Sequence, residues 1–134
     1  MVDVGAKPPM HRIAVAKSFI RLSPATIKLL KKKALPKGDV LAAAQVAGIL
    51  AAKDTARLIP LCHSLPLDSL SVEFTVKKDR IRIQASASMS GRTGVEMEAL
   101  TAVSVSALTL YDMCKAVDKS MAIEGVRVLE KIKS

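Results

Sequence analysis

Two segments of strictly alternating residues, joined by a tight turn, constrain the fold of this 134-residue chain more than any other feature. Residues 69–77 (SLSVEFTVK) and 80–89 (RIRIQASASM) place polar and apolar side chains in turn on either side of Lys78-Asp79. This period of two predicts a β-hairpin that packs one face on a core. An antiparallel sheet is therefore expected, and the helices have to be placed against it.

The rest of the chain predicts two more strands and three helices. Residues 1–10, with Pro8 and Pro9, are expected to form an extended arm, and the segments 59–67 and 90–94 are expected to be irregular. The other predicted elements are a strand over 11–22, helices over 24–34, 39–53 and 95–118, and a strand over 122–131. The order β-α-α-β-β-α-β predicts one α+β domain over residues 1–134, a ferredoxin-like antiparallel sheet with helices packed on one face.

The charge of the chain favours an anionic partner. Lys and Arg number 21 against 12 Asp and Glu, which gives a formal net charge of +9. The candidate partners are nucleic acid, an acidic membrane and a polyphosphate ligand. Only Phe19, Phe74 and Tyr111 are aromatic, which disfavours a protein that stacks nucleic-acid bases. The apolar run 40–52 is too short to span a bilayer and the start resembles no signal peptide, so a cytoplasmic location is expected.

The cysteines and histidines do not predict a metal site. Cys62 and Cys114 lack the paired spacing of zinc ligands, and His11 and His63 are the only histidines. Free thiols, no metal and no cofactor are expected. The apolar residues of helix 39–53 cover most of its circumference, which predicts burial on two sides and favours an oligomer.

Two polar stretches lie in predicted loops. Lys37-Gly38-Asp39 stands at the start of a helix, where free N–H groups suit phosphate, although a solvated lysine beside a capping aspartate fits equally well. Leu61-Cys62-His63 lies between prolines, and His63 is either a proton donor or substrate ligand, or a buried histidine bonded to a carbonyl.

Two more polar stretches lie on the long helix. Glu96 and Glu98 suit the positive end of the helix dipole, and they converge on one ligand only if one of them lies in the preceding loop. Asp112 and Lys115 are three residues apart and form either a surface ion pair or an acid–base pair in a cleft. Fourteen residues, or about 21 Å of helix, separate Glu98 from Asp112. Either the two residues serve different tasks, or a second subunit completes the site, and the two-sided apolar helices favour the second arrangement.

Together these stretches resemble the cyclic pyranopterin monophosphate synthases, the molybdenum cofactor biosynthesis C (MoaC) family. The matching segments span nearly the whole chain in the family's order. They are MVDV at the start, KGDV at 37–40, AGI-x-AAK at 47–53, LIPLCH at 58–63, TGVEMEALTA at 93–102 and LT-x-YDMCKA at 108–116.

The resemblance implies a specific reaction. Members convert a cyclised dihydroguanosine triphosphate, made by a radical enzyme from GTP, into cyclic pyranopterin monophosphate and diphosphate. The resemblance also implies a ferredoxin-like fold and a hexamer, a trimer of dimers with active sites at the dimer interface.

The resemblance also assigns roles to particular residues. Asp112 and Lys115 match the catalytic aspartate and lysine of the family. The remaining matches line the substrate site or lie in basic terminal segments; they are Lys37, Leu61, Cys62, His63, Glu96, Met97, Glu98, Arg12, Lys7 and Lys131.

The sequence departs from the family's pattern in two places. Ser64 stands where the family usually has proline after the Cys-His pair. The chain ends in Lys131-Ile132-Lys133-Ser134 without the glycine-rich tail of the family, so Lys133 is an alternative to Lys131 as the site lysine.

Two other functions are compatible with the same composition. A basic nucleic-acid-binding module on a ferredoxin-like sheet would need exposed aromatics on its central strands. A catalytically idle interaction subunit would leave Lys37, Asp112 and Lys115 without a task.

Overall fold

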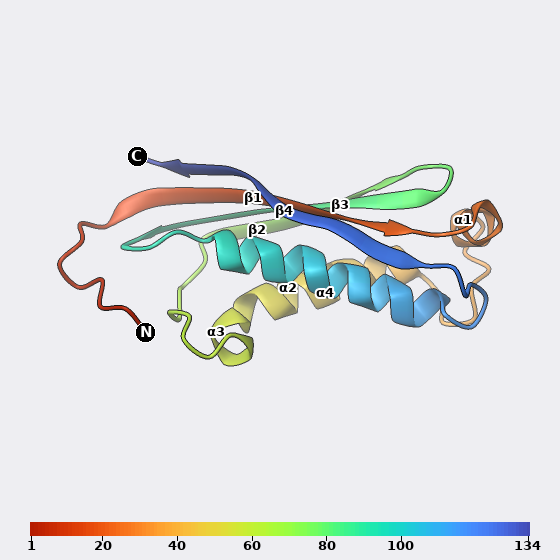
Figure 1. Cartoon of the computed structure of the whole chain (residues 1–134), viewed down its shortest axis with the longest axis horizontal. Coiled ribbons are helices and arrows are strands. Elements are labelled where there is room, and N and C mark those ends of the chain that lie inside the picture. The colour runs from red at the N-terminus through yellow and green to blue at the C-terminus, as the bar shows by residue number, and fades with distance from the viewer.

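The computed structural model describes residues 1–134 and contains one four-stranded antiparallel sheet with the two longest helices packed on one of its faces (Figure 1). The strands lie in the order β2-β3-β1-β4, and every neighbouring pair is antiparallel. The elements are β1 (Met10–Arg21), α1 (Pro24–Lys31), α2 (Val40–Lys53), α3 (Thr55–Leu58), β2 (Ser69–Val76), β3 (Arg80–Gly91), α4 (Glu96–Cys114) and β4 (Ala122–Lys133). The predicted α+β fold with a ferredoxin-like sheet is confirmed.

The structure differs from the sequence prediction mainly at helix ends. The short helix α3 was not predicted. Helix α1 ends at Lys31 rather than residue 34, because Lys33 takes a positive φ of 53°. Helix α4 ends at Cys114 rather than Asp118, because the Asp118 side chain accepts a hydrogen bond from the Ser23 N–H before α1. The irregular segment 59–67 is as expected, whereas the arm contains a turn closed by a hydrogen bond from the Lys7 N–H to the Val4 carbonyl, and β3 extends to Gly91 into the predicted loop 90–94.

Small side chains line the face of β1 that the helices cover. Ala14, Ala16 and Ser18 are buried there, while the larger Ile13 and Val15 point to the other face. Because alanine and serine occupy little space, α4 lies close to the strand. The hydroxyl of Ser18 donates a hydrogen bond of 2.9 Å to the carbonyl oxygen of Val103 in α4. This bond satisfies a buried polar group that would otherwise be costly.

Helices α2 and α4 also approach each other closely. The Ser106 hydroxyl on α4 donates to the Ala44 carbonyl oxygen on α2 at 2.9 Å. A Cβ at Gly48 would overlap Ser106 Oγ and would lie 3.0 Å from the carbonyl oxygen of Ala102. Val46 and Leu50 remain exposed on the outer side of α2. Burial of α2 on two sides is therefore wrong for the single chain, in which no other element covers that side.

Asp118 joins the end of α4 to the start of α1. Its carboxylate accepts hydrogen bonds from the backbone N–H of Ser23 and the hydroxyl of Thr26, both at 2.8 Å. The N–H and hydroxyl of Ser120 donate to its other oxygen. Burial would raise the pKa of Asp118, but these donors outweigh burial and hold that pKa well below its usual range.

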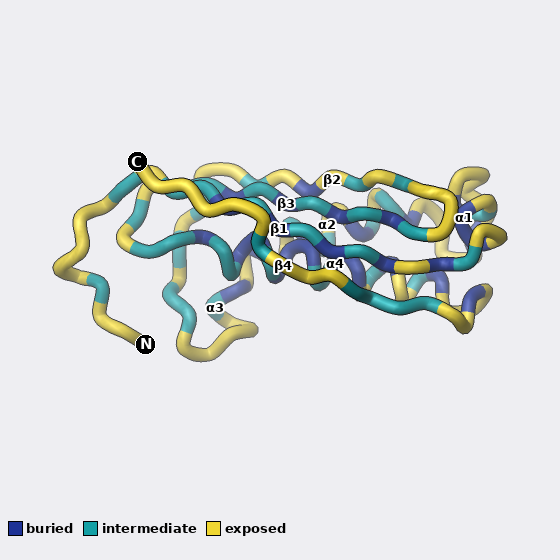
Figure 2. Tube along the Cα trace, turned by 45° about the horizontal axis from the view of Figure 1, so that its top comes forward, coloured by how far each residue is buried: buried dark blue, intermediate teal, exposed yellow.

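No helix covers the other face of the sheet, and the edge strand β4 is exposed along most of its length (Figure 2). The register between β1 and β4 shifts between Val15 and Ala16 and again between Lys17 and Phe19. Gly125 takes a φ of +65° at the second shift, and Lys17 Nζ donates to its carbonyl oxygen at 2.8 Å. None of the helices combines the length and apolar character needed to cross a bilayer.

The contact between α2 and α4 predicts that Gly48→Ala destabilises the protein. Helix propensity alone would give a gain of about 1 kcal/mol. The added methyl has no room beside Ser106 Oγ and the Ala102 carbonyl, so we expect a net loss of about 1–3 kcal/mol in the free energy of unfolding. Urea unfolding of both proteins measures this difference in the free energy of unfolding. An increase in stability would show that the helices separate at little cost.

The hydrogen bonds of Asp118 predict a stability that depends on pH. Because the folded pKa lies below the unfolded value, the carboxylate stabilises the fold above the usual pKa of aspartate, and this contribution is lost as the pH falls through the folded value. We expect Asp118→Asn to cost about 1–3 kcal/mol at pH 7 and less at pH 3. Urea unfolding of both proteins at several pH values tests this. A difference that does not change with pH would contradict it.

Candidate active site

The first group of candidate residues gathers at the C-terminal end of α4. Asp112 accepts hydrogen bonds on both of its carboxylate oxygens, from Lys37 Nζ at 2.8 Å and from Lys115 Nζ at 2.9 Å. Lys115 and Asp112 are neighbours on the helix surface, whereas Lys37 comes from the turn before α2. The turn is fixed because Asp39 caps α2 through a hydrogen bond from the Ala42 N–H. We call these three residues the Asp112 cluster.

The Asp112 cluster holds its groups in the charged state. The hydrogen bond from Lys37, followed by that from Lys115, lowers the pKa of Asp112 to about 2. The Asp112 carboxylate in turn raises the pKa of Lys115 above its ordinary value. All three side chains are about half exposed, so a ligand can reach them. The cluster therefore presents two ammonium groups on one carboxylate at an open surface.

The second group of candidate residues gathers at the opposite end of α4. Glu98, in its first turn, is only 2 % exposed, and its Oε1 has no hydrogen-bond partner. Burial raises the pKa of Glu98, and the nearby charge of Glu96 raises it further. A buried carboxylate oxygen without a partner is costly and calls for a donor, such as an N–H group of a ligand.

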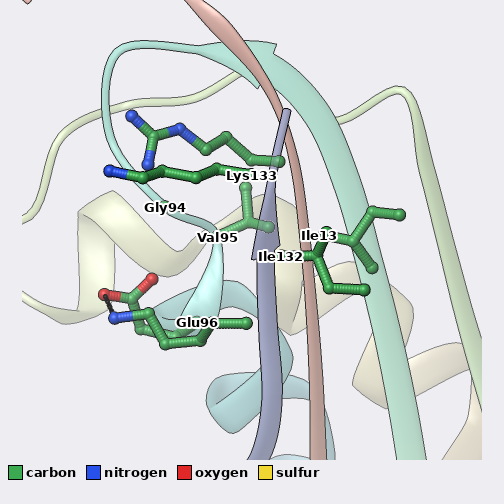
Figure 3. Close-up of a pocket in the computed structure, with 8 residues that line it drawn as sticks. Ile13, Gly94, Val95, Glu96, Ile132 and Lys133 are labelled. Atoms are coloured by element: carbon green, nitrogen blue, oxygen red, sulfur yellow. Dashed lines mark ion pairs between the residues drawn. The ribbon is translucent and has the colours of Figure 1, made fainter.

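Glu96 lines a pocket of ≈ 250 Å³ between the start of α4 and the ends of β1 and β4. Ile13 and Ile132, which pair across β1 and β4, form one side of it (Figure 3). Lys131 Nζ lies 3.6 Å from Glu96 Oε1. The other charged side chains of the lining are Arg12 and Lys133. Three cations around one carboxylate leave a surplus of positive charge.

His63 lies in a neighbouring pocket of ≈ 310 Å³, beside the N-terminal arm. His63 Nε2 donates to the carbonyl oxygen of Val2 at 2.7 Å, and Arg92 Nε donates to that of Lys7 at 3.1 Å. Arg92 lines this pocket, and the segment from Gly91 to Thr93 links it to the pocket around Glu96. We call the region formed by the two pockets and Glu98 the Glu96 region.

Cys62 precedes His63 in the chain but lines neither pocket. Burial raises the pKa of the Cys62 thiol, and Glu98 and Glu96 raise it further. Glu96 and Glu98 both belong to α4, so the expected condition for their convergence on one ligand, that one of them lie in the preceding loop, is not met. Cys62 remains a thiol at neutral pH. The neighbouring Leu61 is 71 % exposed and lines neither pocket.

Two site features were not identified from the sequence. Arg92 was assigned to a loop, although a basic residue between glycines just before a helix is a signal for an anion site. Gly94 stands in the stretch that contains Glu96 and Glu98, but no role was assigned to it. A Cβ at Gly94 would overlap the Glu96 carboxylate, so the glycine leaves space for that side chain. No group of three or more His, Cys, Asp and Glu side chains is placed to hold a metal ion.

The Asp112 cluster and the Glu96 region are far apart in one chain. Helix α4 is unbroken from Glu96 to Cys114 and carries one group at each end (Figure 1). At the rise of an α-helix, the fourteen residues between Glu98 and Asp112 correspond to about 21 Å. The sequence-based separation of the two groups is thus confirmed, and one chain does not bring all candidate residues together.

Comparison with known proteins identifies the family of the chain. A cyclic pyranopterin monophosphate synthase from Novosphingobium aromaticivorans is 56% identical over 131 residues, which cover 98% of this chain and 83% of that protein. One from Chloroflexus aggregans is 56% identical over 98% of this chain and 81% of its own length. A molybdenum cofactor biosynthesis bifunctional protein from Chlorobaculum tepidum is 56% identical over 98% of this chain and 42% of that longer protein. The profile of the MoaC family matches residues 1–134, and the chain therefore belongs to the MoaC family.

Proposed function

We propose that this protein is a cyclic pyranopterin monophosphate synthase, a lyase of molybdenum cofactor biosynthesis. It converts a cyclised dihydroguanosine triphosphate into cyclic pyranopterin monophosphate and diphosphate. The family match over the whole chain carries this proposal, since relatives with 56% identity have this name. The chain acts as one domain, in the cytoplasm and without a cofactor.

Lys115 is the principal proton carrier in this proposal, and Asp112 orients it. Rebuilding the ring system into a pterin requires repeated proton transfers. Because Asp112 raises the pKa of Lys115, the lysine carries a proton at neutral pH and first acts as an acid. It becomes a base only after it has given that proton to the substrate.

Lysine and arginine side chains hold the phosphates. Closing the cyclic phosphate forms a bond between a sugar hydroxyl oxygen and the first phosphorus, breaks the bond to diphosphate, and releases the hydroxyl proton to a base. Lys37, Arg12 and Lys131 stabilise the negative charge on the phosphates and the leaving group. Lys133 lines the same pocket as Arg12 and Lys131, and shares this role.

The Glu96 region binds the purine-derived part of the substrate. Glu98 Oε1 lacks a partner in the protein, so it is free to accept a hydrogen bond from an N–H group of the ring. Glu96 and His63 contribute further polar contacts. Leu61, Cys62 and Met97 lie beside these residues in the sequence and complete the contact surface.

One active site is built from two subunits. The Asp112 cluster and the Glu96 region lie too far apart in one chain for a small substrate, which favours a site completed by the partner's copy of α4. The exposed Val46 and Leu50 of α2 offer apolar surface for assembly into a hexamer, a trimer of dimers. The bifunctional relative in Chlorobaculum tepidum supports a functional link to another enzyme of the pathway, such as the radical enzyme that makes the substrate.

A nucleic-acid-binding role has less support. Phe74 packs against the core, and Phe19 lies under the Lys17 ammonium, 4.4 Å from its ring centre. The sheet therefore lacks the row of free aromatic rings on which bases stack. The names of the relatives reported above do not refer to nucleic-acid binding.

A direct assay tests the proposed function. The purified chain incubated with the cyclised nucleotide is expected to release diphosphate and to form a pyranopterin, both measurable by chromatography. We expect Lys115→Ala to lower kcat by at least about a hundredfold, the usual contribution of a general acid. Lys53→Ala, an exposed lysine at the end of α2, is the control. Near wild-type turnover by Lys115→Ala would remove Lys115 from its assigned role.

Mixing two inactive variants tests the shared site. Lys115→Ala removes one half of the site and Glu98→Gln the other. Subunit exchange between them is expected to restore part of the activity, because each mixed dimer contains one intact site. A mixture of Lys115→Ala and Asp112→Asn, both in the same half, is the control and should stay inactive. Equal failure of both mixtures, with exchange verified by mass spectrometry, would place the site within one chain.

A further inference from the structure

A third hollow, of ≈ 290 Å³, lies between α1 and the turn that joins β2 to β3. It belongs neither to the Asp112 cluster nor to the Glu96 region, and its lining shares no residue with the other two pockets. Lys28 and Lys31 line it from successive turns of α1, and Lys77 and Lys78 line it from the β2–β3 turn. We call this cavity, with its four lysine side chains, the lysine hollow.

The charges of the lysine hollow have no counterpart in the chain. None of its four ammonium groups lies within ion-pair distance of a carboxylate, and no acidic side chain lines the hollow. Asp79 is the next residue along the turn, but its carboxylate binds Arg80 at 3.2 Å. An anion bound in the hollow would supply the countercharge that the chain itself does not provide there.

The shape and lining of the hollow favour a small phosphate ligand. Ile27, which is 2 % exposed, also lines the hollow, together with Pro24 and Val76. No aromatic side chain lines it, so it offers no surface on which a nucleic-acid base stacks. Lysine ammonium groups bind phosphate as point charges and impose no planar geometry. A diphosphate group, with several negative charges in a short span, matches the four lysines.

We propose that the lysine hollow is a binding site for a diphosphate group, separate from the catalytic residues. Free inorganic diphosphate and the polyphosphate end of a nucleotide share this chemistry. This site does not depend on the proposed synthase activity. An experiment that disproves one of the two proposals does not disprove the other.

Lysine footprinting tests this site residue by residue. The full-length protein is acetylated with a water-soluble reagent at increasing concentrations of inorganic diphosphate, and each lysine is followed by mass spectrometry. We expect Lys28, Lys31, Lys77 and Lys78 to become protected together, with one half-saturation concentration. Lys53, at the far end of α2, should not change. Protection confined to Lys37, Lys115 or Lys131 would overturn the proposal, because it would place the anion in the catalytic region alone.

A pair of variants separates a built site from general attraction to a basic protein. In Lys77→Gln/Lys78→Gln, half-protection of Lys28 and Lys31 should require about tenfold more diphosphate, because two of four charge-assisted contacts are lost. The control Lys53→Gln/Arg57→Gln has the same net charge and should behave as wild type. Equal weakening in both variants would overturn the proposal.

Two further probes identify what the hollow recognises. GTP should protect the four lysines as diphosphate does, since only the phosphates are held. Protection by GTP or by a single-stranded oligonucleotide, but not by diphosphate, would show recognition of a base or a nucleic-acid chain and would equally overturn the proposal.

Discussion

The close packing of α4 against β1 and α2 is the contact on which the rest of the structure depends. Alanine and serine on β1 bring the helix near the strand, and Gly48 brings α2 near Ser106. The hydroxyls of Ser18 and Ser106 bond to backbone carbonyls across these contacts at 2.9 Å. Each interface therefore combines van der Waals contact with a directional hydrogen bond. These contacts fix the position of α4 along the sheet, and hence the positions of both of its ends.

A helix held in this way keeps the two groups of candidate residues at a fixed separation. Asp112 and Lys115 lie at one end of α4, Glu96 and Glu98 at the other, and the unbroken helix keeps them apart. The electrostatic environments of the carboxylates at the two ends of α4 also differ. Asp112 is exposed and strongly acidic because two lysines bind it, whereas Glu98 is buried and its pKa is raised. The fold thus gives two carboxylates of one helix opposite electrostatic environments.

Much of this arrangement follows from the sequence. The period-two pattern of β2 and β3, the capping residues Ser23 and Asp39, and the length of α4 are local signals, so the fold and the separation of the two groups were predictable. The family motifs placed Lys37 among the residues that line the site, and its ion pair with Asp112 was not predicted. The space beside Gly94, the burial of Glu98 and the role of Asp118 depend on distant residues in the fold, so no local pattern reveals them. The exposed side of α2 differs from the predicted burial on two sides, because the apolar pattern of the helix does not show which of its sides the rest of the chain covers.

The interrupted register of β4 has a consequence for the behaviour of the protein at high concentration. An exposed edge strand offers its free N–H and C=O groups as a template on which strands of other molecules add, which is how many aggregates begin. Here the two shifts against β1, the left-handed Gly125 and the Lys17 ammonium bound to its carbonyl distort that template halfway along its length. The irregularity in β4 thus acts as a safeguard against uncontrolled polymerisation, and regularising the strand would remove it.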